Sequence, residues 1–189
     1  MSRRFRLFLA LVAAALSASP GIAQEAVKPR MGPVHAEARG PDVFLRFRLE
    51  GAVNPELASK IETGLETAIR YDVRLYRHNA HWLWDDRIDG RRYRVAVTFD
   101  PVTREYVVAE TLDGKPLARS STRDFAEVLR RLVSRENLLV FRVGEAEPHT
   151  NLYVEVRAVF DSGYLFTIIP VDARTPWRPS NRFDFRISP

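Results

Sequence analysis

Residues 77–87, RHNAHWLWDDR, concentrate side chains that could bind a metal, transfer protons or contact a partner. They contain two of the four histidines, two of the three tryptophans and a pair of adjacent aspartates. Imidazole and carboxylate groups are common zinc ligands, and paired carboxylates carry out acid–base catalysis. Exposed indoles are instead typical of protein interfaces. The spacing of these residues distinguishes between a metal site, a catalytic site and a protein interface.

A metal site here would use both histidines and at least one aspartate, drawn from His78, His81, Asp85 and Asp86. The HxxH spacing points both rings the same way only on a helix, because a strand places them on opposite faces. Adjacent aspartates on an extended chain also face apart and do not converge on one substrate atom. The chain has no cysteine, G-x-S-x-G elbow, Walker loop or dinucleotide fingerprint. The balance is therefore against an enzyme, and no cofactor is expected.

The tryptophans offer a different use of the same segment. Trp82 and Trp84 are two positions apart, so on a strand both indoles lie on one face. An inward face would make them part of the core, which we expect, and an outward face would make them a platform for a partner. Trp177, in another loop, could meet them. We therefore predict a structural and partner-binding loop whose contacts come from Trp82, Trp84, Asp85, Asp86 and Trp177.

The N-terminus predicts export. Three arginines within the first six residues precede an apolar run, Leu7 to Leu16, which is too short to cross a bilayer, and small residues then lead to Ala23. This pattern is typical of a cleaved secretory signal peptide, here residues 1–23. The absence of cysteine fits a bacterial periplasm. The expected location is therefore periplasmic or secreted.

The charge balance disfavours nucleic acid as a partner. The chain has 29 basic and 24 acidic residues, a net charge of +5. Loss of the three arginines of the signal peptide leaves 26 basic residues against 24 acidic ones, so the exported chain is close to +2. The remaining arginines alternate with apolar residues, as Arg46 and Arg48 do, which is typical of the polar faces of strands.

The exported chain is expected to have two parts. Residues 24–41 contain three prolines and scattered charges without a period, which predicts a flexible leader. Residues 42–189 then form a single β-rich domain, since a chain of this size buries a sizeable core.

Two helices are predicted within this domain. Asn54 and Pro55 suit a helix start, and an apolar stripe follows through Leu57, Ile61, Leu65, Ala68 and Ile69. The second helix has Ser121 and Asp124 at capping-box spacing, and its stripe is Phe125, Val128, Leu129, Leu132 and Val133.

Period-two alternation marks nine segments as candidate strands, and about eight strands are expected from them: 43–49, 71–77, 91–99, 105–110, 117–120, 138–143, 152–160, 164–169 and 183–187. Turns are expected at 89–90, 100–103 and 113–114. Because the helices interrupt the strands at only two points, a doubly wound parallel fold is disfavoured. The predicted class is α+β, mainly β: an antiparallel β-sandwich or curled sheet with two packed amphipathic helices.

Five segments occur in an order that resembles a known family. They are the Trp-x-Trp-Asp-Asp of residues 82–86, DPVTREYVV at 100–108, TRDFAEVLRRL at 122–132, YVEVRAVFD at 153–161 and WRPSNRFDF at 177–185. The chain is similar in these segments to the exported bacterial proteins of domain of unknown function 4390. The resemblance implies export, this length and a β-rich scaffold, and it implies no activity and no catalytic residues.

Two functions follow from these observations. The first is a non-enzymatic binding or accessory module of the cell envelope, which contacts an envelope protein or the exported domain of a membrane protein. Its contacts would be exposed strand edges and the tryptophan-containing loop. The alternative is a small metal-dependent hydrolase that uses His78, His81, Asp85 and Asp86.

Overall fold

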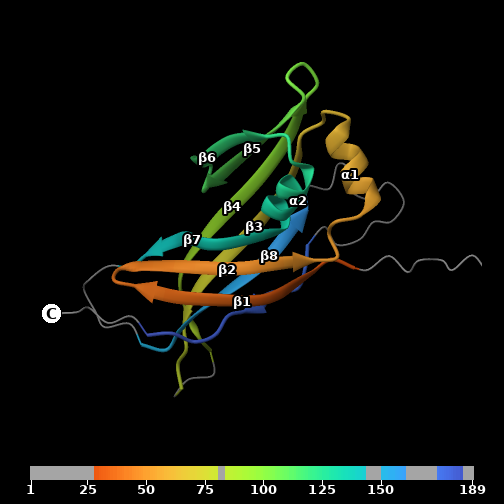
Figure 1. Ribbon diagram of the computed structural model, residues 1–189. Coiled ribbons are helices and arrows are strands. Elements are labelled where there is room, and N and C mark those ends of the chain that lie inside the picture. Colours follow the sequence, from red (N-terminus) through yellow and green to blue (C-terminus); the bar gives the residue numbers. More distant parts are fainter. Residues whose placement is uncertain (1–27, 81–83, 144–149, 161–173, 185–189) are drawn as a thin grey trace, which may run out of the picture.

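The computed structural model describes residues 28–80, 84–143, 150–160 and 174–184. Within these residues the chain forms nine strands and two helices (Figure 1). In chain order they are β1 (Arg30–Arg39), β2 (Asp42–Glu50), α1 (Pro55–Glu62), β3 (Thr67–Arg77), β4 (Asp86–Asp100), β5 (Glu105–Leu112), β6 (Lys115–Thr122), α2 (Phe125–Val133), β7 (Ser134–Arg142), β8 (Leu152–Phe160) and β9 (Arg178–Pro179). In the described part of the chain, neither helix has the length and apolar character needed to cross a membrane.

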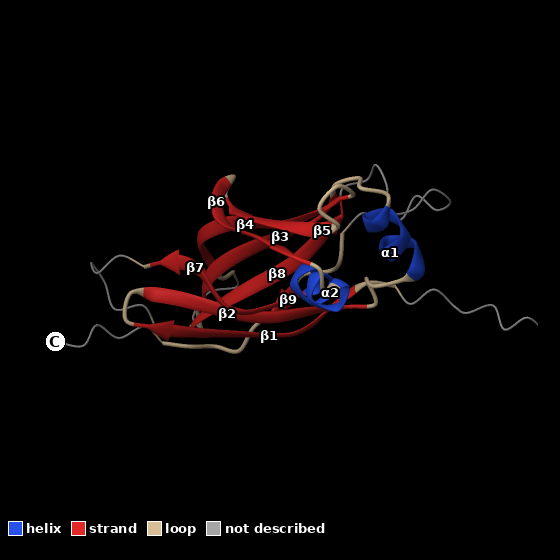
Figure 2. Ribbon diagram, turned by 45° about the horizontal axis from the view of Figure 1, so that its top comes forward, coloured by secondary structure: helices blue, strands red, loops and turns tan. Residues whose placement is uncertain are grey.

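The strands form two antiparallel sheets, one of three strands in the order β1-β2-β7 and one of six in the order β6-β5-β4-β3-β8-β9. Figure 2 shows the sheets as two layers, with α2 at the side where they diverge. The prediction of a mainly β, antiparallel sandwich with two packed helices is confirmed. The face of the six-stranded sheet that points away from the three-stranded sheet is called the outer face below.

Alternation along the strands determines which side chains form the core. On β8, Leu152, Val154, Val156, Ala158 and Phe160 are buried, while the residues between them are half-buried on the outer face. Aromatic rings fill the centre of the sandwich, because the Phe47 and Tyr71 ring centroids are 4.7 Å apart and those of Tyr71 and Tyr93 are 6.0 Å apart. The buried Tyr71 hydroxyl donates a hydrogen bond of 2.7 Å to the carbonyl of Leu132. Burial raises the pKa of this hydroxyl well above its ordinary value.

One carboxylate lies inside this core. Glu110 is 2% exposed because its position on β5 faces inward, on the same side as Val108. Its carboxylate forms an ion pair with Arg135 at the start of β7 and accepts a hydrogen bond of 3.1 Å from the Tyr93 hydroxyl. The Arg135 guanidinium also lies 5.7 Å from the centre of the Tyr93 ring. This buried pair connects the six-stranded sheet to the three-stranded one.

Ordered structure begins earlier than the sequence predicts. Arg30–Arg39 form β1, paired with β2, so the prediction of a flexible leader over residues 24–41 is wrong for this part. The alternation was obscured because Gly32 and Pro33 lie at a register shift between Met31 and Val34, and such an irregularity interrupts the period of two. Residues 24–27 and the predicted signal peptide lie outside the described residues.

Helix α1 begins as predicted and ends sooner. The Asn54 side chain accepts a hydrogen bond of 2.7 Å from the backbone N–H of Leu57, and Pro55 occupies the first turn. The helix ends at Glu62, and Gly64 then adopts a positive φ of 80°, which reverses the chain direction. The predicted stripe is therefore wrong beyond Ile61, since Leu65 is exposed and Ala68 and Ile69 belong to β3.

Helix α2 joins β6 to β7 and contacts strands of both sheets. Its N-cap is Asp124, whose carboxylate accepts from the backbone N–H groups of Ala126 and Glu127, while Ser121 belongs to β6 and does not cap the helix. The predicted stripe is confirmed, with Val128, Leu132 and Val133 buried and Phe125 and Leu129 packed against the core. The helix therefore fills the gap between the two sheets on this side.

Of the three predicted turns, two are confirmed. The Asp100 carboxylate accepts from the backbone N–H of Val102 at 2.8 Å, and Asp113–Gly114 have the two positive φ angles of a tight hairpin turn. The turn at Asp89–Gly90 is wrong, because both residues belong to β4, next to a register shift opposite Leu75. The predicted strand at 164–169 lies outside the described residues.

The C-terminal described segment joins the two sheets at one edge. Ser180 forms a parallel bridge with Val34 of β1, and β9 pairs with β8. The Asn181 side-chain amide accepts from the backbone N–H of Ala36 and donates to its carbonyl, both at 2.9 Å. Phe183 pairs with Leu152 through two backbone hydrogen bonds of 2.9 Å. The segment thus closes the sandwich along β1.

Candidate functional site

The candidate site lies where β3 passes into β4, at the end of the hairpin opposite α1 (Figure 1). The structure describes His78, Trp84, Asp85 and Asp86 there, while the other two residues singled out in the sequence, His81 and Trp82, lie outside the described residues. Because β4 already begins at Asp86, the connection between β3 and β4 is shorter than the sequence predicts.

Asp85 is the residue that fixes the base of this loop. Its Oδ2 accepts a hydrogen bond of 2.7 Å from the Tyr153 hydroxyl, and its Oδ1 accepts from the backbone N–H of Asn79 at 3.1 Å. The Nδ1 of His78 also lies 3.0 Å from Oδ1. His78 and Asn79 lie at the start of the loop, directly after β3, and Tyr153 lies on β8. One carboxylate therefore ties both ends of the loop to the sheet.

These contacts favour the charged form of the carboxyl group. The Tyr153 hydroxyl, followed by the Asn79 backbone N–H, lowers the pKa of Asp85, and His78 adds to this effect. Burial and the hydrogen bond to Asp85 raise the pKa of Tyr153 above its ordinary value, so the phenol stays protonated and donates. The arrangement is an ionised carboxylate held by a phenol hydroxyl, a backbone N–H and an imidazole ring.

Tyr153→Phe is expected to raise the pKa of Asp85 toward its ordinary value, because the hydroxyl is the largest of its lowering contacts. A carboxyl pKa that is lower in the folded state stabilises the fold above the unfolded-state value of about 4, and this contribution is lost as the pH falls below it. The variant should therefore lose less stability than the parent between about pH 4 and the lowered pKa. An NMR titration of the Asp85 carboxyl carbon, with urea unfolding at each pH, measures both quantities.

Tyr76→Phe is the matched control for this experiment. The Tyr76 ring stacks on that of Tyr153 with centroids 5.3 Å apart, so it shares the same surroundings, but Asp85 accepts from Tyr153 and not from Tyr76. An Asp85 titration that is the same in the Tyr153 variant and in the parent would contradict the assignment.

Trp84 precedes this anchored carboxylate and points away from the fold. Its side chain is 75% exposed, so the prediction that it belongs to the core is wrong. The ends of β3 and β4 next to this residue extend past β1 and β2 of the three-stranded sheet (Figure 1). Asp86, the residue after Asp85, is also exposed. The two aspartates therefore have different surroundings, one held by hydrogen bonds and the other facing solvent.

Trp177 lies away from this loop, on the outer face of the six-stranded sheet. The guanidinium carbons of Arg74 and Arg157 lie 4.0 and 4.4 Å from the centre of its ring. Arg157 also donates two hydrogen bonds to Asp72, of 2.8 and 3.0 Å. Trp177 is half-buried and packs on the side chains of Arg74 and Arg157, which lie on β3 and β8. Its indole therefore has a structural role in the outer face.

The chemistry open to the described residues is limited. No group of three or more histidine, cysteine or carboxylate side chains suited to a metal ion occurs among them. Both oxygens of Asp85 already accept hydrogen bonds, and Asp86 lies on the first position of β4 with its side chain exposed. The geometry is that of a rigid loop base with an exposed indole.

Sequence reasoning missed the two tyrosines that support this loop, Tyr76 and Tyr153. Tyr153 is 68 positions from Asp85, and no local pattern connects them. One indication was present, since Tyr153 stands between the inward-facing Leu152 and Val154 and so places an aromatic ring on the polar face of β8.

One family model matches the chain, that of DUF4390, described as a domain of unknown function, over residues 28–173. No curated protein and no solved structure matches the chain. The match covers β1 to β8 and the loop, and it agrees with the resemblance found in the order of the sequence segments.

Proposed function

Because the chain belongs to the DUF4390 family, whose description assigns no activity, we propose a function from the site itself. The protein is an exported, non-enzymatic binding module of the cell envelope. It contacts a protein partner, either an envelope protein or the exported domain of a membrane protein, through the loop between β3 and β4. Export rests on the basic and apolar N-terminus described above, and binding rests on the loop geometry.

The observation that carries this proposal is the exposure of Trp84 beside the anchored Asp85. An indole that is 75% exposed leaves a large apolar area in water, and it gains free energy when a partner covers that area. Tryptophan is among the residues that contribute most to protein interfaces, and it does so best when its neighbours are already ordered. The hydrogen bonds of Asp85 supply that order next to Trp84.

The surroundings of Trp84 favour a protein partner. Asp86 is exposed at the same end and disfavours the phosphate groups of nucleic acid. Apart from this loop, β6 is the outer strand of the six-stranded sheet at the other end of the hairpin, and such an edge offers unpaired backbone groups to a partner strand.

Photo-crosslinking in cells tests the proposal. A photoreactive amino acid at Ile88, which is 38% exposed on β4, should give one discrete crosslinked product in the periplasm. In the Trp84→Ala background this product should be lost, because truncation of an interface tryptophan costs about 2 kcal/mol or more in binding. The melting midpoint should change little, since substitution of an exposed side chain alters stability by about 0.5 kcal/mol or less.

Val102→Ala is the matched control. Val102 is 89% exposed on the turn between β4 and β5, at the opposite end of the hairpin, so its truncation should leave the crosslinked product unchanged. An undiminished product in the Trp84 variant would overturn the proposal. A cytosolic location of the full chain would overturn export without bearing on the loop.

A further inference from the structure

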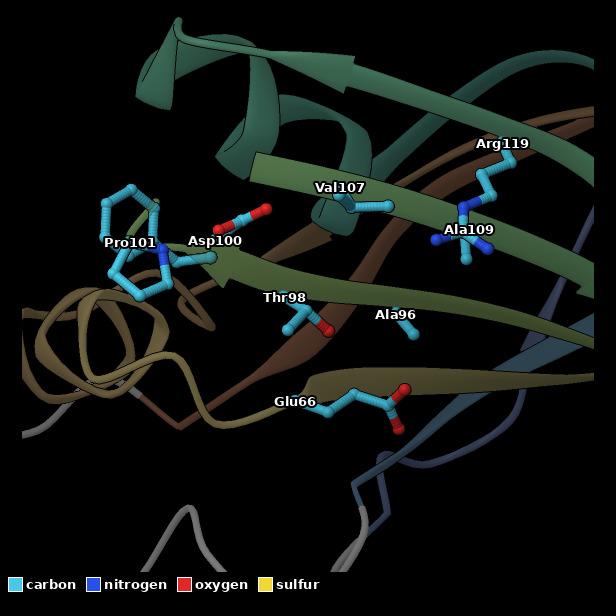
Figure 3. Close-up of a pocket in the computed structure, with 9 residues that line it drawn as sticks. Glu66, Ala96, Thr98, Asp100, Pro101, Val107, Ala109 and Arg119 are labelled. Carbon is cyan, nitrogen blue, oxygen red and sulfur yellow. The ribbon is translucent and has the colours of Figure 1, made fainter. Parts of the chain in front are cut away.

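A hollow lies on the outer face at the other end of the hairpin from the candidate site. It has a volume of about 490 Å³ and is lined by Glu66, Ala96, Thr98, Phe99, Asp100, Pro101, Val107, Ala109 and Arg119. Figure 3 shows Ala96, Thr98, Val107 and Ala109 along the floor on β4 and β5, with Arg119 on β6 and Glu66 directly before β3. The hollow is about eleven strand residues away from Trp84, which is roughly 35 Å along β3.

Strand register explains why the sheet is hollow here. Ala68 of β3 pairs with Ala96 of β4, and Ala96 pairs with Ala109 of β5, so three methyl side chains cross the sheet in one row. The neighbouring row carries Arg70 opposite Arg94, whose side chains rise above the sheet. Small residues beside long ones leave an apolar depression, and Ala96 and Ala109 are among the residues that line it.

Two charged groups at the ends of this depression lack a partner of opposite charge. Ala109 pairs with Arg119 of β6, and no carboxylate pairs with this guanidinium among the described residues. Asp100 accepts only within its own turn, from the backbone N–H groups of Val102 and Thr103 and from the Thr103 side chain, and no cationic side chain pairs with it in that same part of the chain. The third charged group, Glu66, is already paired with Arg94 at 2.5 Å.

The two unpaired charges lie at opposite ends of the apolar floor (Figure 3). The Arg119 side chain extends across β5 toward Ala109, and the Asp100 carboxylate lies at the far end beside Pro101. A ligand that fits both must carry a negative group at one end, a positive group at the other and an apolar body between them. A short peptide with free termini has this form.

We infer that the hollow binds short zwitterionic peptides, with the terminal carboxylate on Arg119 and the terminal ammonium on Asp100. The span between Ala109, opposite Arg119, and Glu105, opposite Asp100, is four strand residues, or about 13 Å. An extended peptide covers about 3.3–3.6 Å per residue, so three or four residues fit. Small apolar side chains would rest on the alanine row.

Tri-alanine with free termini is the probe that tests this inference. Titration of the peptide into the full-length protein at millimolar concentration should shift the NMR methyl signals of Ala96 and Ala109. Arg119→Gln and Asp100→Asn should each weaken binding by about tenfold or more, the loss expected for one charge-assisted hydrogen bond. Asparagine at position 100 retains an oxygen that can accept from the Val102 backbone, so the turn is preserved.

Arg92→Gln is the matched control, since it removes the same charge from the same face of β4 outside the hollow and should leave binding unchanged. Capped peptides give a second, mutation-free test: N-acetylation should reproduce the loss seen with Asp100→Asn, and C-amidation that seen with Arg119→Gln.

Three results would overturn the inference. They are an absence of methyl shifts at millimolar tri-alanine, binding that neither variant weakens, and full binding of the N-acetylated peptide. The last would identify a site for organic anions that depends on Arg119 alone. None of these results bears on the Trp84 loop, which lies at the opposite end of the hairpin.

Discussion

Replacing Leu132 with alanine is expected to lower the free energy of unfolding by about 2 to 5 kcal/mol, the range found for leucine removed from a close-packed core. Leu132 is fully buried on α2, at the point where the helix fills the gap between the sheets. The substitution leaves the backbone carbonyl that accepts from the Tyr71 hydroxyl, so the loss measures the side chain. Urea unfolding followed by fluorescence gives the value.

Two further leucines calibrate this result. Leu129 lies on the same helix but is only half-buried, so Leu129→Ala should cost less than Leu132→Ala. Leu139, on β7, is 38% exposed, and Leu139→Ala should cost least of the three. Equal losses at positions 132 and 139 would show that α2 does not insert between the sheets.

Arg135→Met is expected to destabilise the fold by about 3 kcal/mol. The change removes the positive charge that compensates Glu110, and an uncompensated buried carboxylate costs about 3–5 kcal/mol. The lower end applies because the Arg135 side chain is itself 24% exposed and water reaches part of the pair. The Tyr93 hydroxyl still donates to Glu110 in the variant, which also limits the loss.

A double variant separates the charge effect from packing. Glu110→Leu together with Arg135→Met removes both partners, and it should restore most of the stability, because apolar pairs replace buried ion pairs at little cost. Arg46→Met provides the surface control, since the Arg46–Glu136 pair is 3.8 Å apart with both side chains exposed and should contribute about 0.5 kcal/mol or less. A double variant no more stable than Arg135→Met would show that the pair has a packing role instead.

Much of the scaffold could be predicted because its alternation is locally complete. The strand over residues 152–160 was placed with the bounds that the structure has, since no glycine or proline interrupts its period of two. The start of α1 was also predictable, because Asn54 and Pro55 act through bonds within a few residues. Its end was not, since Leu65, Ala68 and Ile69 fit a helical stripe as well as they fit the strand that pairing with β4 enforces.

The remaining errors come from irregular pairing. Gly32 and Pro33 at the β1 register shift resemble a flexible leader, and Asp89–Gly90 within β4 resemble a turn. In both cases the residues accommodate a distortion of a strand, which local sequence does not distinguish from its end.

The candidate site was predictable only in part. The loop that contains Trp84 and Asp85 was identified from its composition, but its exposed indole was expected in the core. Whether an indole is buried depends on which strands cover it, and here the ends of β3 and β4 next to the loop extend past β1 and β2 (Figure 1). The hollow at Arg119 was not found at all, because its alanine row is created by the register of three strands and has no local pattern.

The closure of β1 by Asn181 has a consequence for how the chain reaches its fold. The two residues joined by that side chain, Ala36 and Asn181, are 145 positions apart, so the contact closes a loop of nearly the whole domain. Loop-closure entropy delays contacts of this kind, and they form after the local hairpins. Until then the hairpin of β1 and β2 has an open edge on β1, to which another chain can add. The interval before the last residues arrive is therefore when a newly made molecule is most exposed to mispairing and aggregation.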